Sequence, residues 1–323
     1  MSDLRCFEER PLRLGVSSCL LGNPVRYDGG HRRDRFVADV LSRFVEWVPV
    51  CPEVEAGMGT PRPTLRLERE DTAVRLREVV SGNDHTGGMQ RFAAKRVRAL
   101  RRLDLCGYVL KESSPSCGMT RVEVYSEKGR PRREGRGLYA AALMEAYPNL
   151  PLEDEGRLND PRLRESFIER IFAYRRLRSL FSERWTNGQV VAFHTAHELQ
   201  LTAHSPAAYR ALGRLVAELE GVPRTVFRAQ YQSGFMDALA RPVTRGRNTN
   251  VLKHASGYLV KQLDASSRAE LGDLIEEYRR GLVPLVVPVT LICHYVRLYE
   301  VESLRGQHFL EPHPQELMLR NHV

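Results

Sequence analysis

Three short apolar runs in the first half of the chain each end close to a cysteine that stands among proline, glycine and serine. These cysteines are Cys19, Cys51 and Cys117. Short apolar runs that stop at turn residues are typical of buried strands in a parallel sheet. Ligands of open α/β sheets gather outside the carboxyl ends of such strands. The sequence therefore predicts three thiols at one sheet edge, where they can bind a metal or cluster and leave one position open.

The same cysteines also have a plainer interpretation, because a buried cysteine is more often a small apolar residue than a ligand. The chain contains no C-x-x-C pair, so cysteine spacing alone is a weak metal signal. The other three cysteines, Cys6, Cys106 and Cys293, lack the strand-end context, and we expect Cys106 to lie in the core.

The hydrophobic pattern changes along the chain and predicts two domains. In the first part, strand-like runs at 12–18, 47–51 and 105–111 alternate with helical patterns at 34–46, 88–103 and 136–147. This alternation favours an α/β domain with a parallel sheet and flanking helices. The following part has helical periodicity only, at 161–183, 189–203, 205–220, 223–239, 264–280 and 286–300. We therefore predict an all-α second domain.

The boundary between the domains is predicted from helix-start signals. An acidic stretch with Pro and Gly closes the first part, and Asn159 or Asp160 can cap a helix that has Pro161 at its first position. This gives an expected division into residues 1–158 and 159–323. Within the second domain, Gly246 and Asn248 suggest a flexible loop.

The chain is basic and contains no membrane-spanning pattern. Its 323 residues carry 49 Lys and Arg against 40 Asp and Glu, a formal net charge of +9. A basic balance favours anionic partners such as nucleic acid. The first residues are polar and charged, so we expect no signal peptide. The longest apolar run, 282–293, is broken by prolines and is too short to span a bilayer. We expect a cytoplasmic protein with reduced thiols and no membrane partner.

Three segments of the first part resemble the motifs of the thiouracil desulfidase family. They are SSCLLGNPVRYDGG (17–30), CPEVEAGMGTPRPTLRL (51–67) and KESSPSCG (111–118). The resemblance implies a 4Fe-4S cluster bound by Cys19, Cys51 and Cys117, with one iron open for the substrate sulfur. It also implies catalytic roles for Glu53 and Ser114.

The second part resembles the YbgA-type domain of unknown function. The segments that carry this resemblance are 193–213, 250–263 and 278–295. Fusions of the two domains resemble bacterial desulfidases that act on 4-thiouridine in transfer RNA.

Glu53 is the natural base for making a nucleophile from water, because it lies two residues after a cysteine ligand. Its other interpretation is a carboxylate that caps a turn or pairs with an arginine, and Glu55 is the second candidate for the base. A hydroxyl at Ser114 can hold a nucleobase or relay a proton. Ser113 and Ser116 are alternatives, and a turn-forming serine is the plainer interpretation.

The polar loop beside the first cysteine contains Arg26, Tyr27 and Asp28. It either binds the substrate or caps a helix, and the sequence does not separate these interpretations. His194, His197 and His204 have helical spacing but no H-E-x-x-H pattern, so buried or RNA-facing histidines are favoured over a zinc site.

A basic stretch without acidic residues runs between Asp237 and Asp264. It includes Arg245, Arg247 and Lys253, which we predict to contact an RNA backbone, since such clusters position phosphates without reading sequence. The alternative is a solvated charged face.

Three functions remain. The favoured one is a non-redox desulfidase of 4-thiouridine in transfer RNA. The second is a desulfidase of free 2-thiouracil or thionucleosides. The third is a non-catalytic iron–sulfur protein that binds RNA or senses redox state.

Overall fold

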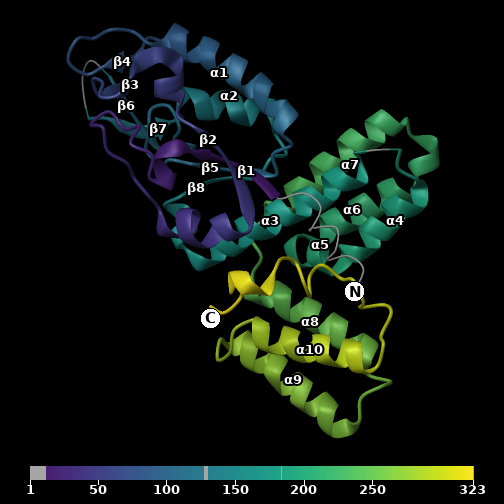
Figure 1. The fold of residues 1–323 in the computed structure, drawn as a ribbon. Helices are drawn as coiled ribbons and strands as arrows, with labels where there is room; N and C mark the ends of the chain where they lie inside the picture. The colour runs from purple at the N-terminus through teal and green to yellow at the C-terminus, as the bar shows by residue number, and fades with distance from the viewer. Residues whose placement is uncertain (1–11, 127–129, 183, 323) are drawn as a thin grey trace. The chain divides into compact units, whose positions relative to one another are not determined.

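The computed structural model describes residues 12–126, 130–182 and 184–322, which form two compact units divided between Phe167 and Ile168. The division lies nine residues beyond the expected boundary at 158/159, within a helix that continues across it. Figure 1 shows the helices and strands of both units.

A four-stranded parallel sheet forms the centre of the first unit. Its strands are β1 (Leu12–Ser17), β2 (Val45–Val50), β5 (Gly107–Leu110) and β8 (Leu152–Asp154), in the order β2-β1-β5-β8. Leu14 and Val16 of β1 and the whole of β5 are buried, as expected for central parallel strands. The predicted parallel sheet with flanking helices is thus confirmed.

Two helices of this unit, α1 (Thr86–Leu100) and α2 (Leu138–Ala146), pack against one another. The phenol of Tyr139 on α2 lies 3.2 Å from that of Tyr108 on β5, which joins α2 to the sheet. The helix predicted over 34–46 is shorter than expected: a π-helix, Phe36–Val40, is followed by one 3₁₀ turn, Leu41–Arg43. It ends there because residues from Val45 onward pair with β1.

A second sheet, which the sequence pattern did not predict, adjoins the cysteine-bearing loops in sequence. It contains β3 (Leu65–Glu70), β4 (Ala73–Glu78), β6 (Val122–Tyr125) and β7 (Arg132–Gly135), in the order β4-β3-β6-β7. β3 and β4 are rich in Arg and Glu, so they carry little apolar signal. Ion pairs across the hairpin stabilise it: Arg77 lies 3.1 Å from Glu70 and 3.7 Å from Glu68.

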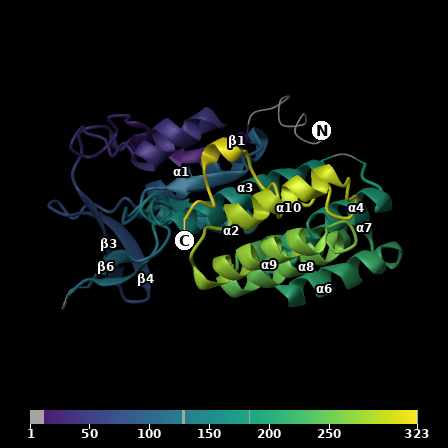
Figure 2. The same ribbon diagram turned by 90° about the horizontal axis from the view of Figure 1, so that it is seen from below.

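The second unit is helical, as predicted. Its helices are α3 (Pro161–Leu180), α4 (Asn187–Ala196), α5 (Glu198–His204), α6 (Pro206–Ala217), α7 (Arg224–Leu239), α8 (Arg245–Leu259), α9 (Ala265–Arg280) and α10 (Val286–Leu298). One apolar cluster is rich in aromatic residues and joins helices α3 to α7. Another joins α5 to α8, α9 and α10, which Figure 2 shows packed together.

Helix α8 corrects the expectation of a flexible loop at Gly246 and Asn248. The side chain of Thr244 accepts a hydrogen bond from the Arg247 backbone N–H and caps the helix. Burial of Val251, Leu252, Ala255 and Leu259 then outweighs the weak helix propensity of the first turn. Among the residues described, no helix is long and apolar enough to cross a membrane.

Candidate active site

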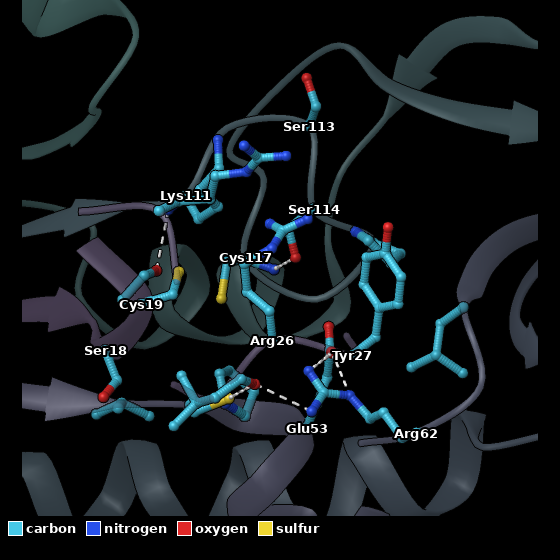
Figure 3. Close-up of a pocket in the computed structure, with 18 of the residues that line it drawn as sticks. Ser18, Cys19, Arg26, Tyr27, Glu53, Arg62, Lys111, Ser113, Ser114 and Cys117 are labelled. Carbon is cyan, nitrogen blue, oxygen red and sulfur yellow. Dashed lines mark hydrogen bonds and ion pairs between the residues drawn. The ribbon is translucent and has the colours of Figure 1, made fainter. Parts of the chain in front are cut away.

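A cavity of about 350 Å³ lies at the carboxyl ends of the parallel strands and is lined by the three cysteines. Cys19 follows β1, Cys51 follows β2, and Cys117 lies in the loop after β5. In Figure 3 the side chains of Cys19, Cys117, Arg26 and Glu53 face the same central space. Cys106 is buried in the core and does not line the cavity.

The three thiols are held in surroundings that disfavour their charged form. Burial raises the pKa of Cys19 to about 11, and it raises the pKa of Cys51 and, most strongly, that of Cys117. Cys51 adds to the rise at Cys19, and both Cys19 and Cys51 add to the rise at Cys117, because like charges within one site repel. A cationic group in the cavity would supply the missing compensation, since a bound metal stabilises thiolates.

The donor set fits a cluster better than a single ion. Over the described ranges, no three His, Cys, Asp or Glu side chains could together hold one metal ion. In a 4Fe-4S cluster each cysteine binds a different iron, so three ligands need not meet at one point. Three thiols around one cavity match that requirement.

Glu53 lies on the cavity wall in a fixed orientation. Its Oε2 accepts hydrogen bonds from Arg62 Nε, at 2.8 Å, and from a terminal nitrogen of the same guanidinium. Its Oε1 accepts a hydrogen bond from the Ser116 hydroxyl at 2.8 Å. The side chains of Arg62 and Glu53 are only 4% and 15% exposed. The pairing with an arginine that the sequence left open is therefore present, and it aims the carboxylate at the cavity.

Glu55, the second candidate for the base, does not line this cavity. Its Oε1 accepts a hydrogen bond from the Cys51 backbone N–H at 3.1 Å, and its Oε2 lies 3.2 Å from Arg96 of α1. Glu55 therefore supports the loop that carries Cys51, while Glu53 faces the space between the thiols.

The three serines of the Cys117 loop have different surroundings. The Ser114 Oγ lines the cavity and accepts hydrogen bonds from the backbone N–H groups of Ser116 and Cys117, at 3.2 and 3.0 Å. The Ser116 side chain is fully buried and donates to Glu53. Ser113 is exposed, and its hydroxyl points away from the thiols (Figure 3). Ser114 thus shapes the loop and keeps its own hydroxyl proton available to the cavity.

The loop after Cys19 contributes Arg26 and Tyr27 to the cavity wall, whereas Asp28 does not line it. The Asp28 carboxylate accepts a hydrogen bond from the Gly30 backbone N–H at 3.0 Å, which lowers its pKa and closes the turn. The Arg26 guanidinium lies 5.3 Å from the centre of the Tyr27 ring. The structure thus gives Asp28 a turn-forming contact and leaves Arg26 and Tyr27 facing the cavity.

Sequence reasoning missed four charged residues of the cavity wall: Arg32, Arg62, Lys111 and Glu112. Lys111 forms an ion pair with the buried Glu155. The only sequence signal for Arg62 is its position between Pro61 and Pro63, because the two prolines restrict the backbone on both sides of it.

The predicted RNA-binding residues lie in the second unit, on α8. The Arg247 guanidinium donates to the backbone carbonyls of His204 and Pro242, at 2.9 and 3.4 Å. Arg245 is half-buried, and its guanidinium lies against Gly281. Lys253 is exposed on the outer face of the helix. Among the residues that the structure describes, the Lys253 side chain has no hydrogen-bond or ion-pair partner.

The three histidines for which a zinc site was considered make other contacts. His194 Nδ1 lies 3.0 Å from the Tyr231 hydroxyl. The His197 ring packs 4.2 Å from that of His308, and His204 Nδ1 lies 2.7 Å from the Arg241 carbonyl.

A family model described as "2-thiouracil desulfurase" matches residues 14–155, which include all three cysteines and Glu53. The protein YbbK of Bacillus subtilis (strain 168), which is uncharacterized, is 32% identical over 150 residues, 45% of this chain and 97% of that protein. The chain belongs to the 2-thiouracil desulfurase family. This desulfurase domain is fused to a second one, for which the model "Protein of unknown function (DUF1722)" matches residues 198–314.

The second domain has its own relative. The uncharacterized protein YbgA of Escherichia coli (strain K12) is 34% identical over 165 residues, 51% of this chain and 98% of that protein. A solved structure described as the [4Fe-4S]-dependent thiouracil desulfidase TudS is 31% identical to this chain, with a TM-score of 0.38, and the match covers 46% of this chain and 93% of that one.

Proposed function

We propose that this protein removes sulfur from a thiolated uracil by hydrolysis, releases it as sulfide, and has 4-thiouridine in transfer RNA as its preferred substrate. The observation that carries the proposal is the cavity of about 350 Å³ on which three thiols and one fixed carboxylate, Glu53, converge. A base that faces the thiols is needed for catalysis, whereas an RNA-binding or redox-sensing protein needs cluster ligands alone. Free 2-thiouracil or a thionucleoside is the alternative substrate. We place the reaction in the cytoplasm.

Cys19, Cys51 and Cys117 would hold a 4Fe-4S cluster through their thiolates. When bound, such a cluster supplies a thiophilic, Lewis-acidic iron without a cysteine ligand, which polarises the carbon–sulfur bond of the substrate.

The side chains of the cavity supply the remaining chemistry. Water adds at the carbon that carries sulfur, the carbon–sulfur bond breaks, and a carbonyl and hydrogen sulfide are formed, with no net transfer of electrons. Glu53 takes a proton from the attacking water, and its bonds to Arg62 and Ser116 keep the carboxylate aimed while it does so. Ser114 keeps one hydroxyl proton to donate to the nucleobase.

The remaining cavity residues bind the base. Tyr27 presents a ring on which a uracil can stack, and Arg26 places a cation beside it. A base within folded RNA must leave its stack to reach this cavity. The net charge of +9 favours association with RNA, and the helical unit would add phosphate contacts, with Lys253 the most available of its predicted residues.

The test is sulfide release under anaerobic conditions from thiolated transfer RNA and from free thiouracil, measured on protein reconstituted with iron and sulfide. We expect about four iron per chain. Loss of iron is expected in the Ala variants of Cys19, Cys51 and Cys117, and normal iron in those of Cys106 and Cys293. Normal iron in any variant of the first group would refute the ligand assignment.

A second pair of variants tests the base. Glu53→Gln should keep the cluster and lower turnover about 10²-fold or more, the contribution of a general base. Glu55→Gln is the matched control, because Glu55 does not line the cavity. A near-normal rate for Glu53→Gln would refute its role, and absence of sulfide from every substrate would favour the non-catalytic alternative.

A further inference from the structure

A second cavity, of about 610 Å³, adjoins the thiol-lined one. The two cavities share a wall made of Thr64, Leu65, Glu112, Ser113 and Pro115, so a ligand in the first can continue directly into the second. The first cavity suffices for a uracil ring. A free base therefore leaves the second cavity unused.

The second cavity has a strongly polar lining. Its floor is formed by β3 and β6 of the second sheet, and four arginines border it: Arg66, Arg121, Arg133 and Arg157. Apolar side chains such as Leu67 and Val122 contribute the rest of the floor. A site of this kind matches a sugar with an attached anion better than a second base.

Three of these four arginines already form ion pairs with glutamates. Arg66 lies 2.6 Å from Glu68, Arg133 lies 3.3 Å from Glu123, and Arg157 lies 2.6 Å from Glu153.

Among the described residues, the exposed side chain of Arg121 forms no hydrogen bond or ion pair. An arginine without a carboxylate partner is a ready site for a phosphate, which its planar guanidinium can bind with two hydrogen bonds.

The backbone holds Arg121 in this place at a conformational cost. Its φ is 57°, in the left-handed region that non-glycine residues rarely adopt. The loop just before it is tied to the end of β8, because the Asp154 carboxylate accepts a hydrogen bond from the Met119 backbone N–H at 3.3 Å. A strained residue held by its surroundings is characteristic of functional positions.

The shared wall carries groups suited to a sugar. Ser113 also has a left-handed φ of 57°, lines both cavities, and directs its hydroxyl away from the thiols (Figure 3). Beside it, the exposed Glu112 offers carboxylate oxygens, which are common acceptors for ribose hydroxyls. A ligand that passes this wall therefore meets hydroxyl-binding groups and then a cation.

We propose that the second cavity receives the ribose and phosphate attached to the thiolated base, with Ser113 and Glu112 at the sugar and Arg121 at the phosphate. This inference rests on the proposed function, since it assumes that the base occupies the first cavity. The ligand chemistry is that of a uridine phosphate, and its source is either a free mononucleotide or one nucleotide of an RNA strand.

The test compares kcat/KM for 4-thiouridine, 4-thiouridine 5′-monophosphate and a short single-stranded oligoribonucleotide with one internal 4-thiouridine. For the wild type we expect a phosphorylated substrate to exceed the nucleoside about tenfold or more, as for a hydrogen bond to a charged group. Arg121→Gly should remove most of this preference. Glycine suits a positive φ, so this variant should melt at the same temperature or higher.

The matched control is Arg98→Ala, which removes the same charge from an exposed position on α1 that lines neither cavity. It should leave the preference unchanged. If Arg121→Gly lowers only the oligonucleotide value, the phosphate belongs to RNA; if it lowers the monophosphate value, a mononucleotide fits the site. Equal kcat/KM for all three wild-type substrates, or an equal loss for all three in Arg121→Gly, would overturn the proposal.

Equilibrium binding separates this inference from the proposed function. Uridine 5′-monophosphate should bind the wild-type protein about tenfold tighter than uridine, and Arg121→Gly should abolish the difference. This readout needs no sulfur chemistry. Absence of sulfide release from any substrate would defeat the proposed function, whereas equal binding of the two uridines would defeat the second-cavity assignment.

Discussion

Acid should destabilise the helical unit, because three of its histidines, one buried and two partly buried, have lowered pKa values. Burial lowers the pKa of His308 to about 3 and that of His313 to about 4, with nearby arginines adding to the effect. Burial also lowers the pKa of His197 well below its usual value, and its Nε2 accepts a hydrogen bond from Arg176 Nε at 3.3 Å. Protonation of any of these rings therefore opposes the folded packing.

The magnitude follows from linkage between protonation and folding. In the unfolded chain a histidine titrates near pH 6.5, so between about pH 7 and pH 5 the unfolded state takes up protons that the folded state does not. The stability supplied by each neutral histidine is complete above its unfolded pKa and is lost as pH falls. By pH 5, each such histidine lowers the free energy of unfolding by about 2 kcal/mol, and the three together lower it by about 6 kcal/mol. That is a large part of the 5–15 kcal/mol by which domains are typically stable, given as an order of magnitude.

Urea unfolding at pH 7, 6 and 5 measures this loss. The chain has two tryptophans, Trp47 in the first unit and Trp185 in the second, so a Trp47→Phe background reports the helical unit alone. His308→Phe keeps a ring but removes one titrating group, and it should shrink the loss between pH 7 and pH 5 by about 2 kcal/mol. His294→Phe, at an exposed position, is the control. Equal pH slopes for His308→Phe and the wild type would refute the reasoning.

Three further predictions concern the site and its partner. A Cβ at Gly118 would lie 2.4 Å from one neighbouring side-chain atom and 2.8 Å from a backbone oxygen. Gly118→Ala should therefore lower the free energy of unfolding by about 1–3 kcal/mol and reduce bound iron. An unchanged melting temperature would contradict this prediction. Ser116→Ala removes a hydrogen bond to Glu53, and we expect normal iron with turnover reduced about tenfold; full turnover would show that the bond to Arg62 suffices. Lys253→Ala with Lys261→Ala should weaken transfer RNA binding and flatten its salt dependence, measured at two salt concentrations; an unchanged slope would remove these lysines from the interface.

The parts of the fold that could be predicted from the sequence depend on local chemistry. Pro161 does stand at the first position of α3, and Asp264 caps α9 by accepting a hydrogen bond from the Ser267 backbone N–H. These signals act within one turn, so a single sequence contains them. The ends of β1 and β2 were similarly marked, because apolar runs there stop at polar turns.

The parts that could not be predicted depend on partners distant in the chain. β3 is stabilised by opposite charges on β4 and by pairing with β6, more than fifty residues later. In the site, the choice between Glu53 and Glu55 depended on which carboxylate faces the cavity, and only the fold assigns Arg62 to one and Arg96 to the other. Sequence reasoning therefore reached the residue types of the site but not the pairs that orient them.

Arg62 connects the loop after Cys19 to its own loop, between β2 and β3, through backbone groups. Besides Glu53, its guanidinium donates to the carbonyl oxygens of Val25 and Gly59, at 3.0 and 2.9 Å, and its own N–H donates to the Tyr27 carbonyl at 2.9 Å. Since every residue has a carbonyl, substitutions at 25, 27 and 59 leave these bonds in place. The side chains that meet the substrate can therefore diversify in evolution while the carboxylate that activates water stays where it is, which gives one scaffold the means to serve different thiolated bases.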